Sequence, residues 1–355
     1  MTRYCSRCGV PRILSAEHRW DSGGTLSLAR DSSHRMVIVD NVALTNILDS
    51  IKEGTGVPVD PIVTEAKRKS GRHFMDAVLS GVKGVAMRNL ASAAVYRQLG
   101  KQSSMLGLGH AQVTSYRRHR FLEGVVTDVY NGPAMAGDIC GAFDSVEGRA
   151  GEVSHEMGDD GCLHLSINAS GRTRPRDLDG RGAGGRAPLP GRNIFELCPV
   201  CKAPAELGKR FAFDMDRGII NELKTGHRVA MIGVISLRSL FGELEAELGA
   251  EIPRMIMAVE KDRVRDVILR KGKDLDTGAG GYLNYMRTLT IRGMGNGTEA
   301  SVSGKTVRAR VENPYFEPLV AGFLAGFYEA TGGVDSRVGW TTADPSYTEV
   351  TLEPA

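Results

Sequence analysis

The chain has 355 residues, of which 41% are hydrophobic and 25% are charged, and its formal net charge is +3. This length suits two domains of ordinary size, and the composition is close to the average for globular proteins. The near-neutral charge argues against a basic binding face, so no nucleic acid is expected on the folded domains.

The chain starts MTRYCSRC, without the apolar segment of a secretory signal. Its longest apolar run, around residues 318–328, is much shorter than the ~20 residues that a membrane-spanning helix needs. We therefore expect no membrane span and a cytoplasmic location. In that compartment, CxxC pairs favour metal or redox chemistry over structural disulfides.

An internal repeat organises the sequence. Residues 198–249 match residues 5–56 without a gap, at a constant separation of 193 positions. The matched pairs include Cys5 with Cys198, Cys8 with Cys201, His34 with His227, Arg35 with Arg228, and Gly56 with Gly249. Further along, Tyr130 matches Tyr315 at a separation of 185. A repeat of this kind predicts a tandem duplication.

In chain order, each half begins with its CxxC knuckle and a turn-rich stretch that predicts a small hairpin. Strands are predicted at residues 36–39 and 229–234, and each is followed by an amphipathic helix, near 42–56 and 236–248. Second helices are predicted at 60–79 and 253–269, and a third helix of the first half at 83–99. The corresponding stretch of the second half, 277–285, is rich in glycine and gives no clear pattern. The halves end in strand, strand, helix, strand, strand, with the helices at 133–146 and 316–330.

Strands that follow one another in sequence favour antiparallel pairing, which predicts an α+β fold. We expect two pseudo-symmetric repeats, each an antiparallel sheet with helices packed on one face plus a small CxxC hairpin. The domains would be residues 1–169 and 194–355. Residues 170–193 are rich in Gly, Arg and Pro and would form a flexible linker.

The CxxC pairs are the strongest chemical signal. A tetrahedral zinc site takes four thiolate or imidazole ligands, and each half supplies only two thiols. The economical arrangement is one structural zinc held by Cys5, Cys8, Cys198 and Cys201. A site completed by a second chain or by His18 is the alternative, and thiols that bind no metal are another. A redox dithiol would need a helix to begin at the CxxC, and no helical period begins there.

The repeated His34-Arg35 and His227-Arg228 pairs precede the first core strand of each half. They could bind an anion or a polar head group, or they could be ordinary turn residues. Glycines four residues apart occur in both last helices, Gly137 with Gly141 and Gly322 with Gly326. This spacing predicts close packing against a neighbouring helix or sheet.

The C-terminal part of each half resembles the vinyl-4-reductase (4-vinyl reductase) domain family. Its members end with a Gly-containing helix, a strand, and a Gly-Asp-x-x-Cys turn into a last strand. Here residues 158–162 read GDDGC after the helix at 133–146, and residues 343–347 read ADPSY after its twin. The second half thus has Tyr347 in place of Cys162. The resemblance covers most of each half outside the knuckle and the linker.

This resemblance implies a small-molecule-binding α+β module, as found in aromatic-sensing activators and tetrapyrrole-related proteins, with a fold shared by vesicle-tethering subunits. We expect a non-enzymatic protein that binds or senses a hydrophobic, aromatic or tetrapyrrole-like molecule, with the pocket in the first half. The expected ligand-binding residues are His34, Arg35, Tyr130, Cys140, Cys162, His227 and Arg228.

A reductase acting on a tetrapyrrole or aromatic substrate is one alternative, and an assembly or scaffold protein is another. The sequence has no nucleotide-binding fingerprint and no nucleophile–base pair, so no catalytic residue is assigned. A homodimer or a protein partner remains open.

Overall fold

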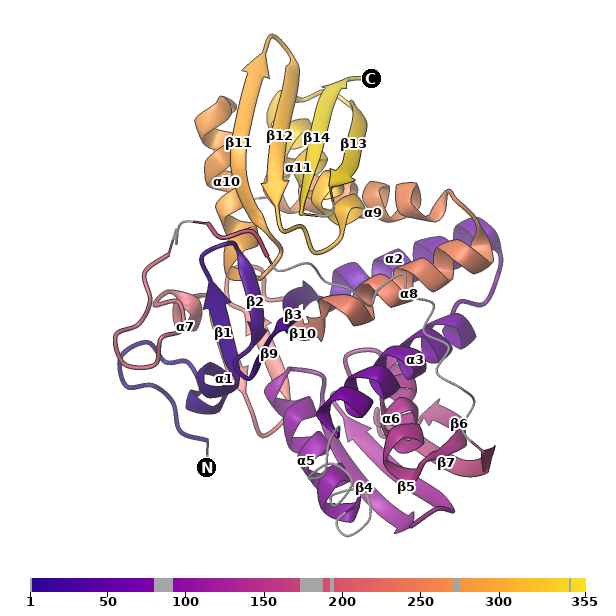
Figure 1. The fold of residues 1–355 in the computed structure, drawn as a ribbon. Helices are drawn as coiled ribbons and strands as arrows, with labels where there is room; N and C mark the ends of the chain where they lie inside the picture. Colours follow the sequence, from indigo (N-terminus) through magenta and orange to yellow (C-terminus); the bar gives the residue numbers. More distant parts are fainter. Residues whose placement is uncertain (1, 80–91, 173–187, 192–194, 271–274, 345) are drawn as a thin grey trace.

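The computed structural model describes residues 2–79, 92–172, 188–191, 195–270, 275–344 and 346–355. The fold is α+β and contains three antiparallel sheets with helices packed on them (Figure 1). The predicted fold class is confirmed at this level. Most of the predicted linker and residues 83–91 of the predicted third helix lie outside the described residues.

The two halves have the same order of elements. The first half contains α1 (Arg12–Glu17), β1 (His18–Asp21), β2 (Thr25–Leu28), β3 (Asp31–Asp40), α2 (Asn41–Thr55), α3 (Asp60–Val78), α5 (Ser92–Met105), β4 (His110–Arg117), β5 (Phe121–Thr127), α6 (Gly132–Glu147), β6 (Arg149–Met157) and β7 (Leu163–Arg172).

The second half contains α7 (Leu207–Arg210), β8 (Phe211–Asp214), β9 (Ile219–Glu222), β10 (Arg228–Gly233), α8 (Val234–Leu248), α9 (Ile252–Leu269), α10 (Ala279–Ile291), β11 (Asn296–Ser303), β12 (Thr306–Glu312), α11 (Glu317–Gly332), β13 (Ser336–Asp344) and β14 (Tyr347–Pro354). The helix α10 covers most of the glycine-rich stretch at 277–285, which shows no clear pattern in the sequence.

One six-stranded sheet is built from both halves, in the order β1-β2-β3-β10-β9-β8. The halves join in its middle, where β3 and β10 pair antiparallel. Alternate side chains of a strand point to opposite faces. Met36 and Ile38 of β3 therefore pack with the CxxC knuckles, whereas Val37 and Val39 pack in the larger core with α2 and α8.

Each half also forms a four-stranded sheet of its own, in the orders β4-β5-β7-β6 and β11-β12-β14-β13. We call β4–β7 with α3, α5 and α6 the first sheet module, and β11–β14 with α9, α10 and α11 the second. Figure 1 shows the two sheets at opposite ends of the molecule, magenta and orange-yellow, with α2 and α8 between them. The long helices pack in pairs, α6 on α3 and α11 on α9.

Each sheet module docks on strands that belong to the other half. After α5, the carbonyl of Leu106 accepts a hydrogen bond from the backbone N–H of Met231 in β10 (2.8 Å). The matching bond in the second module runs from the N–H of Ile38 in β3 to the carbonyl of Arg292 (2.8 Å). The helices follow the same exchange, since α3 packs against α8 and α9 packs against α2. The two halves are therefore interlocked.

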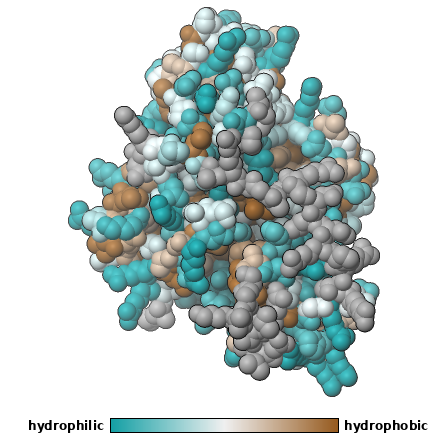
Figure 2. Space-filling model, viewed as in Figure 1, coloured by the Kyte–Doolittle hydropathy of each residue, from teal (hydrophilic) through white to brown (hydrophobic). Residues whose placement is uncertain are grey.

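None of the helices in the described part of the chain is long and apolar enough to cross a membrane. The face in Figure 2 is mostly hydrophilic, and hydrophobic side chains gather over the region of α1 and α7 at its left. Exposed apolar side chains near the knuckles are Tyr4, Ile13, Leu197 and Val200.

Candidate metal centre

The two CxxC segments form matching turns. In the first, the N–H of Cys5 bonds to the carbonyl of Val10 (2.8 Å) and that of Gly9 bonds to the carbonyl of Cys5 (2.9 Å). In the second, the N–H of Cys198 bonds to Ala203 (2.7 Å) and that of Lys202 to Cys198 (2.9 Å). Residues 9 and 202 both adopt the left-handed conformation that ends such a turn.

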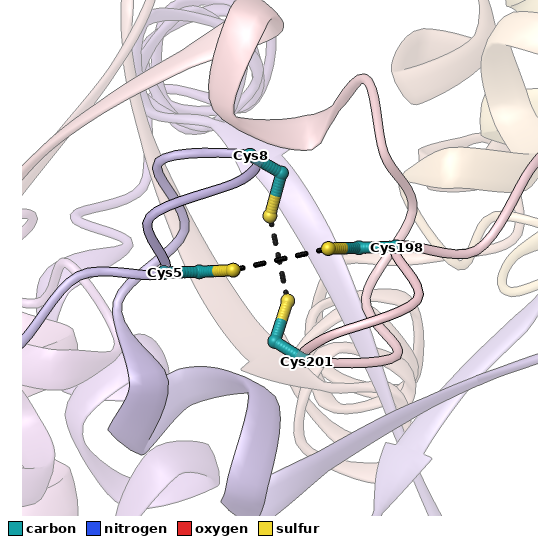
Figure 3. A group of neighbouring side chains, drawn as sticks. All are labelled: Cys5, Cys8, Cys198 and Cys201. Carbon is teal, nitrogen blue, oxygen red and sulfur yellow. Dashed lines mark hydrogen bonds between the residues drawn. The ribbon is translucent and has the colours of Figure 1, made fainter.

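The four thiols of these turns meet at one point (Figure 3). The Sγ atoms of Cys5 and Cys198 lie 3.8 Å apart, those of Cys8 and Cys201 lie 3.4 Å apart, and all four lie within 4.8 Å of one another. Tetrahedral ligation at a Zn–S distance of about 2.3 Å would separate the sulfurs by about 3.8 Å. A disulfide would instead bring two sulfurs to about 2.05 Å. The donor set and its spacing therefore fit a metal ion such as zinc.

Backbone hydrogen bonds lower the pKa of two of the thiols, and burial raises the pKa of the other two. The backbone N–H groups of Cys8 and Arg7 lower the pKa of the Cys5 thiol to about 6. Those of residues 201 and 200 likewise lower the pKa of Cys198. Burial raises the pKa of Cys8 to about 12, and it also raises the pKa of Cys201. A bound cation favours the thiolate form of every ligand, so its charge would offset this burial.

The surrounding packing brings the two turns together. The knuckles share an apolar cluster with the six-stranded sheet, in which Val10, Leu14, Ala203 and Leu207 are almost fully buried. Gly208 in α7 lies so close to the first turn that a Cβ at this position would collide with the carbonyl oxygen of Cys8. Glycine is thus required there for the two halves to approach each other.

A thioredoxin-type dithiol does not match this geometry. That chemistry places the CxxC at the first turn of a helix, where the helix dipole lowers the thiol pKa. Here the helices begin later, at Arg12 and Leu207. Convergence of all four thiols favours metal binding instead.

The two predicted His-Arg pairs lie at the docking surfaces between halves. The Arg35 guanidinium donates to the carbonyl of Asn313 (2.6 Å), at the end of β12 in the second module. Arg228 donates to the carbonyls of Val129 (3.2 Å) and Gly107 (3.0 Å) in the first module. Burial lowers the pKa of Arg35 to about 10. Both arginines therefore satisfy backbone carbonyls of the opposite half.

The histidines of these pairs differ in their contacts. His227 Nδ1 lies 2.8 Å from Asp40 Oδ2, whose carboxylate belongs to the first half. His34 instead packs on the ring of Phe74 in α3, with ring centroids 4.8 Å apart.

Tyr130 belongs to a buried polar network. Its hydroxyl donates to Asp138 Oδ2 (3.1 Å), which also lies 3.1 Å from the ammonium of Lys67. Lys67 donates in turn to the hydroxyl of Ser236 in α8 (2.6 Å). Burial raises the pKa of Tyr130 far above its ordinary value, and it also raises the pKa of Asp138.

The other two predicted cysteines lie apart from this network. Cys140 is fully buried in α6, where its thiol faces the carbonyl of Gly151 (3.6 Å) and burial raises its pKa to about 12. Cys162 is partly exposed, and its backbone N–H donates to the Asp160 carboxylate (3.0 Å). Among the described residues, the four knuckle cysteines are the predicted site residues whose side chains meet.

Several charged residues of the interior were not predicted from the sequence. Four of these side chains are buried or partly buried and form ion pairs: Lys67, Asp138, Asp40 and Glu260. The sequence did contain a signal for these buried charges. Lys67 and Glu260 occupy the same position of the repeat, and each interrupts the apolar face of its helix, α3 or α9. A polar residue at a core position needs a partner.

No family model matches the chain, and no curated protein matches it by sequence. The likeness to the vinyl-4-reductase domains therefore stays a prediction from the sequence motifs.

Proposed function

We propose that Cys5, Cys8, Cys198 and Cys201 hold one structural zinc ion that joins the two halves of a tandem duplication. The convergence of both CxxC pairs supports this, because neither half supplies a complete tetrahedral ligand set. Such a site contributes its binding free energy directly to folding. The zinc would hold the two knuckles against the six-stranded sheet.

On this scaffold, we infer that the protein is a non-enzymatic binder or sensor of a hydrophobic small molecule, built from two domains of the vinyl-4-reductase type. The observation that carries this inference is the divergence of the two sheet modules at matched positions. In the second module, Tyr285 stacks on Phe323 and Phe327 with ring centroids 4.4 and 4.2 Å apart. In the first module, Asp138 stands at the position of Phe323, at the separation of 185. The matching bonds of Leu106 and Arg292 align α5 with α10 at a separation of 186, so Leu99 stands at the position of Tyr285.

Duplication followed by this divergence favours one binding module and one structural module. In the second module, stacked aromatic rings pack the interior without the help of a ligand. The first interior keeps the polar groups of Tyr130, Asp138 and Lys67 within an apolar shell. Binding sites for small molecules combine an apolar lining with a few oriented polar groups in this way.

The test is a thermal-shift screen of the intact, zinc-loaded chain against hydrophobic aromatics, tetrapyrroles and acyl chains. We expect one class to raise the melting temperature, and Tyr130→Phe to reduce that response. The matched control is Tyr315→Phe, at the same repeat position of the second module, which should keep it. A response lost only in Tyr315→Phe would reverse the assignment of the halves, and no response from any class would count against ligand binding.

An assembly role is the second candidate, because Ile13 and Leu197 have exposed apolar side chains and hydrophobic side chains gather over the region of α1 and α7 in Figure 2. Isolated exposed apolar residues are common, but a contiguous group of them marks contact surfaces. This candidate predicts that the intact protein is a homodimer in light scattering and that the double variant Ile13→Ser, Leu197→Ser is monomeric. A wild-type monomer would remove this support.

A further inference from the structure

The linker between the halves is held by one side chain of the second half. Within the linker, the structure describes the segment 188–191, which reads Pro-Leu-Pro-Gly. The N–H of Leu189 donates to Asn313 Oδ1 (2.7 Å), and Asn313 Nδ2 donates to the carbonyl of Leu189 (2.9 Å). One side-chain amide therefore exchanges both backbone hydrogen bonds with Leu189, as a residue of a neighbouring β-strand does.

The chemistry of this segment suits it to such binding. Proline has no N–H, so Leu189 carries the only backbone donor of residues 188–190, and Asn313 accepts from it. A residue that precedes proline is restricted to extended backbone, and Leu189 precedes Pro190. The segment therefore loses little conformational freedom when it binds, which favours the recognition of proline-flanked peptides.

The amide that receives the segment is fixed on the second sheet module. Asn313 follows β12 and is 3% exposed. Its own N–H donates to the carbonyl of Ser346 (2.6 Å), and its carbonyl accepts from Arg35 (2.6 Å). Its Nδ2 also donates to the carbonyl of Gly23 (2.8 Å), in the turn between β1 and β2. Asn313 thus connects the linker, the first half and the second module.

Two glycines let the linker lie directly on this turn, residues 22–24, which we call the β1–β2 turn. A Cβ at Gly23 would collide with the carbonyl oxygen of Leu189. A Cβ at Gly191 would lie only 2.7 Å from the carbonyl oxygen of Ser22. Neither glycine has a positive φ. The close approach of the two chain segments, and not the backbone conformation, therefore requires glycine at both positions.

The two halves dock their turns alike. The N–H of Gly295 in the second module donates to the carbonyl of Gly24 in the β1–β2 turn (3.1 Å). In the first module, the N–H of Gly109 donates to the carbonyl of Gly218, in the turn between β8 and β9 (3.1 Å). The first module therefore provides a direct comparison for the linker contact.

At the matching position of the first module, an ion pair takes the place of the linker. Asp128 matches Asn313 at the separation of 185, and the two residues have φ 50° and 51°. The Asp128 carboxylate accepts hydrogen bonds from the guanidinium of Arg217 (2.7 and 3.0 Å). A carboxylate has no N–H to donate to a peptide carbonyl. The exchange of two hydrogen bonds with a peptide is thus specific to Asn313.

We propose that Asn313 and the β1–β2 turn form a binding site for an extended, proline-flanked peptide segment, and that residues 188–191 occupy it as an internal latch. The latch holds the turn of the first half on the second sheet module. Without it, Asn313 Oδ1 loses its donor and the turn loses its cover. The site uses no thiol of the candidate metal centre and no polar group of the first module's interior, so it stands whether or not zinc or a hydrophobic molecule binds.

Hydrogen–deuterium exchange of the intact, zinc-loaded chain tests the latch. We expect the Leu189 amide to exchange about a hundredfold more slowly than in the free peptide of residues 187–192. Asn313→Asp gives the second module the carboxylate that the first has at Asp128. In this variant, the exchange of Leu189 and of the β1–β2 turn should each rise about tenfold. Asp128→Asn is the matched control, because it makes the reverse change at the matching position, and it should leave both rates unchanged.

Leu189→Pro provides a second variant in case Asn313→Asp folds poorly, because it removes the bound N–H and leaves Asn313 in place. Exchange of the β1–β2 turn should again rise about tenfold, whereas Leu178→Pro, the same substitution elsewhere in the linker, should not change it. Two results would overturn the proposal. One is a Leu189 amide that exchanges as fast in the wild-type protein as in the free peptide. The other is a β1–β2 turn that keeps its wild-type exchange in a folded Asn313→Asp or Leu189→Pro protein.

Discussion

The Glu222 carboxylate is a buried charge held by two arginines. It lies at the end of β9 with 5% of its side chain exposed, 2.7 Å from Arg292 and 3.4 Å from Arg210. Burial alone would raise its pKa. The guanidinium groups and a hydrogen bond from Thr225 outweigh burial and hold the pKa at about 2, against an ordinary value of 4.5.

This depressed pKa predicts a contribution to stability that depends on pH. The contribution is complete above the unfolded-state pKa and is lost as the pH falls from about 4.5 toward about 2. Replacing Glu222 by Gln should lower the free energy of unfolding by about 3 kcal/mol at neutral pH, because the two arginines lose their partner. Urea denaturation of both proteins across this pH range measures the effect. We expect the gap to narrow on acidification, and a gap that stays constant with pH would contradict this role of Glu222.

Residue types alone predicted the cluster of four cysteines better than they predicted the contacts of the other candidate residues. The CxxC spacing and its repetition predicted the thiol cluster that the structure shows. The contacts of Arg35 and Arg228 could not be predicted, because an arginine that bonds to backbone carbonyls leaves no pattern in the carbonyl-bearing residues. Tyr130 was singled out, but its network with Asp138 and Lys67 depends on the packing of α6 against α3, which the sequence does not show.

At the level of elements, the sequence placed most helices within a few residues of their ends. The expected helix at 60–79 is α3 (Asp60–Val78), and that at 253–269 is α9 (Ile252–Leu269). The helix α10 was missed because Gly280 and Gly281 occupy its first turn. Its buried residues Tyr282, Met286 and Leu289 nevertheless keep a helical spacing.

The paired glycines set how closely α6 approaches α3. A Cβ at Gly137 would collide with the carbonyl of Thr64, and one at Gly141 with that of Arg68. Gly322 and Gly326 lie in the same way against α9. The close helix packing predicted from the glycine spacing is therefore confirmed.

Gly141→Ala should destabilise the protein by about 2–3 kcal/mol, because the added methyl group must push two helix backbones apart. The control is Gly242→Ala in α8, where a Cβ meets no atom within 4 Å. There the substitution should stabilise by up to about 1 kcal/mol through helix propensity. Chemical denaturation of both variants tests this pair, and equal effects would show that α6 and α3 can separate without cost.

In the whole molecule, each sheet module packs against strands of the opposite half. A sequence repeat shows that two segments are related. It does not show whether a segment packs against its own half or against the other half, because both halves offer the same surfaces. The repeat therefore could not predict that each sheet module docks on the opposite half. The shared sheet and the reciprocal hydrogen bonds of Ile38 and Met231 establish that arrangement.

Interlocking predicts how the protein responds to a cut between its halves. The composition of residues 170–193 favours early tryptic cleavage between Arg172 and Arg192. Because β3 pairs with β10 and each sheet module docks on a strand of the other half, both fragments should stay together. A denaturing gel should show two fragments while size-exclusion chromatography shows one intact particle. Fragments that separate under native conditions with zinc present would contradict the exchange.

The four-cysteine cluster also joins the halves, and the proposal that it holds one shared zinc ion is the central claim about this protein. Removing one ligand from a tetrahedral thiolate site should release the metal and loosen both knuckles, since each turn depends on the same ion. Cys198→Ser removes a ligand, whereas Cys140→Ser changes a buried thiol outside the centre and serves as the control.

Native mass spectrometry of the intact chain, purified without chelator, tests this claim most directly. The account predicts one zinc ion per chain in the wild type and in Cys140→Ser, and none in Cys198→Ser. Two zinc ions per chain, no zinc in the wild type, or a zinc ion retained by Cys198→Ser would contradict it.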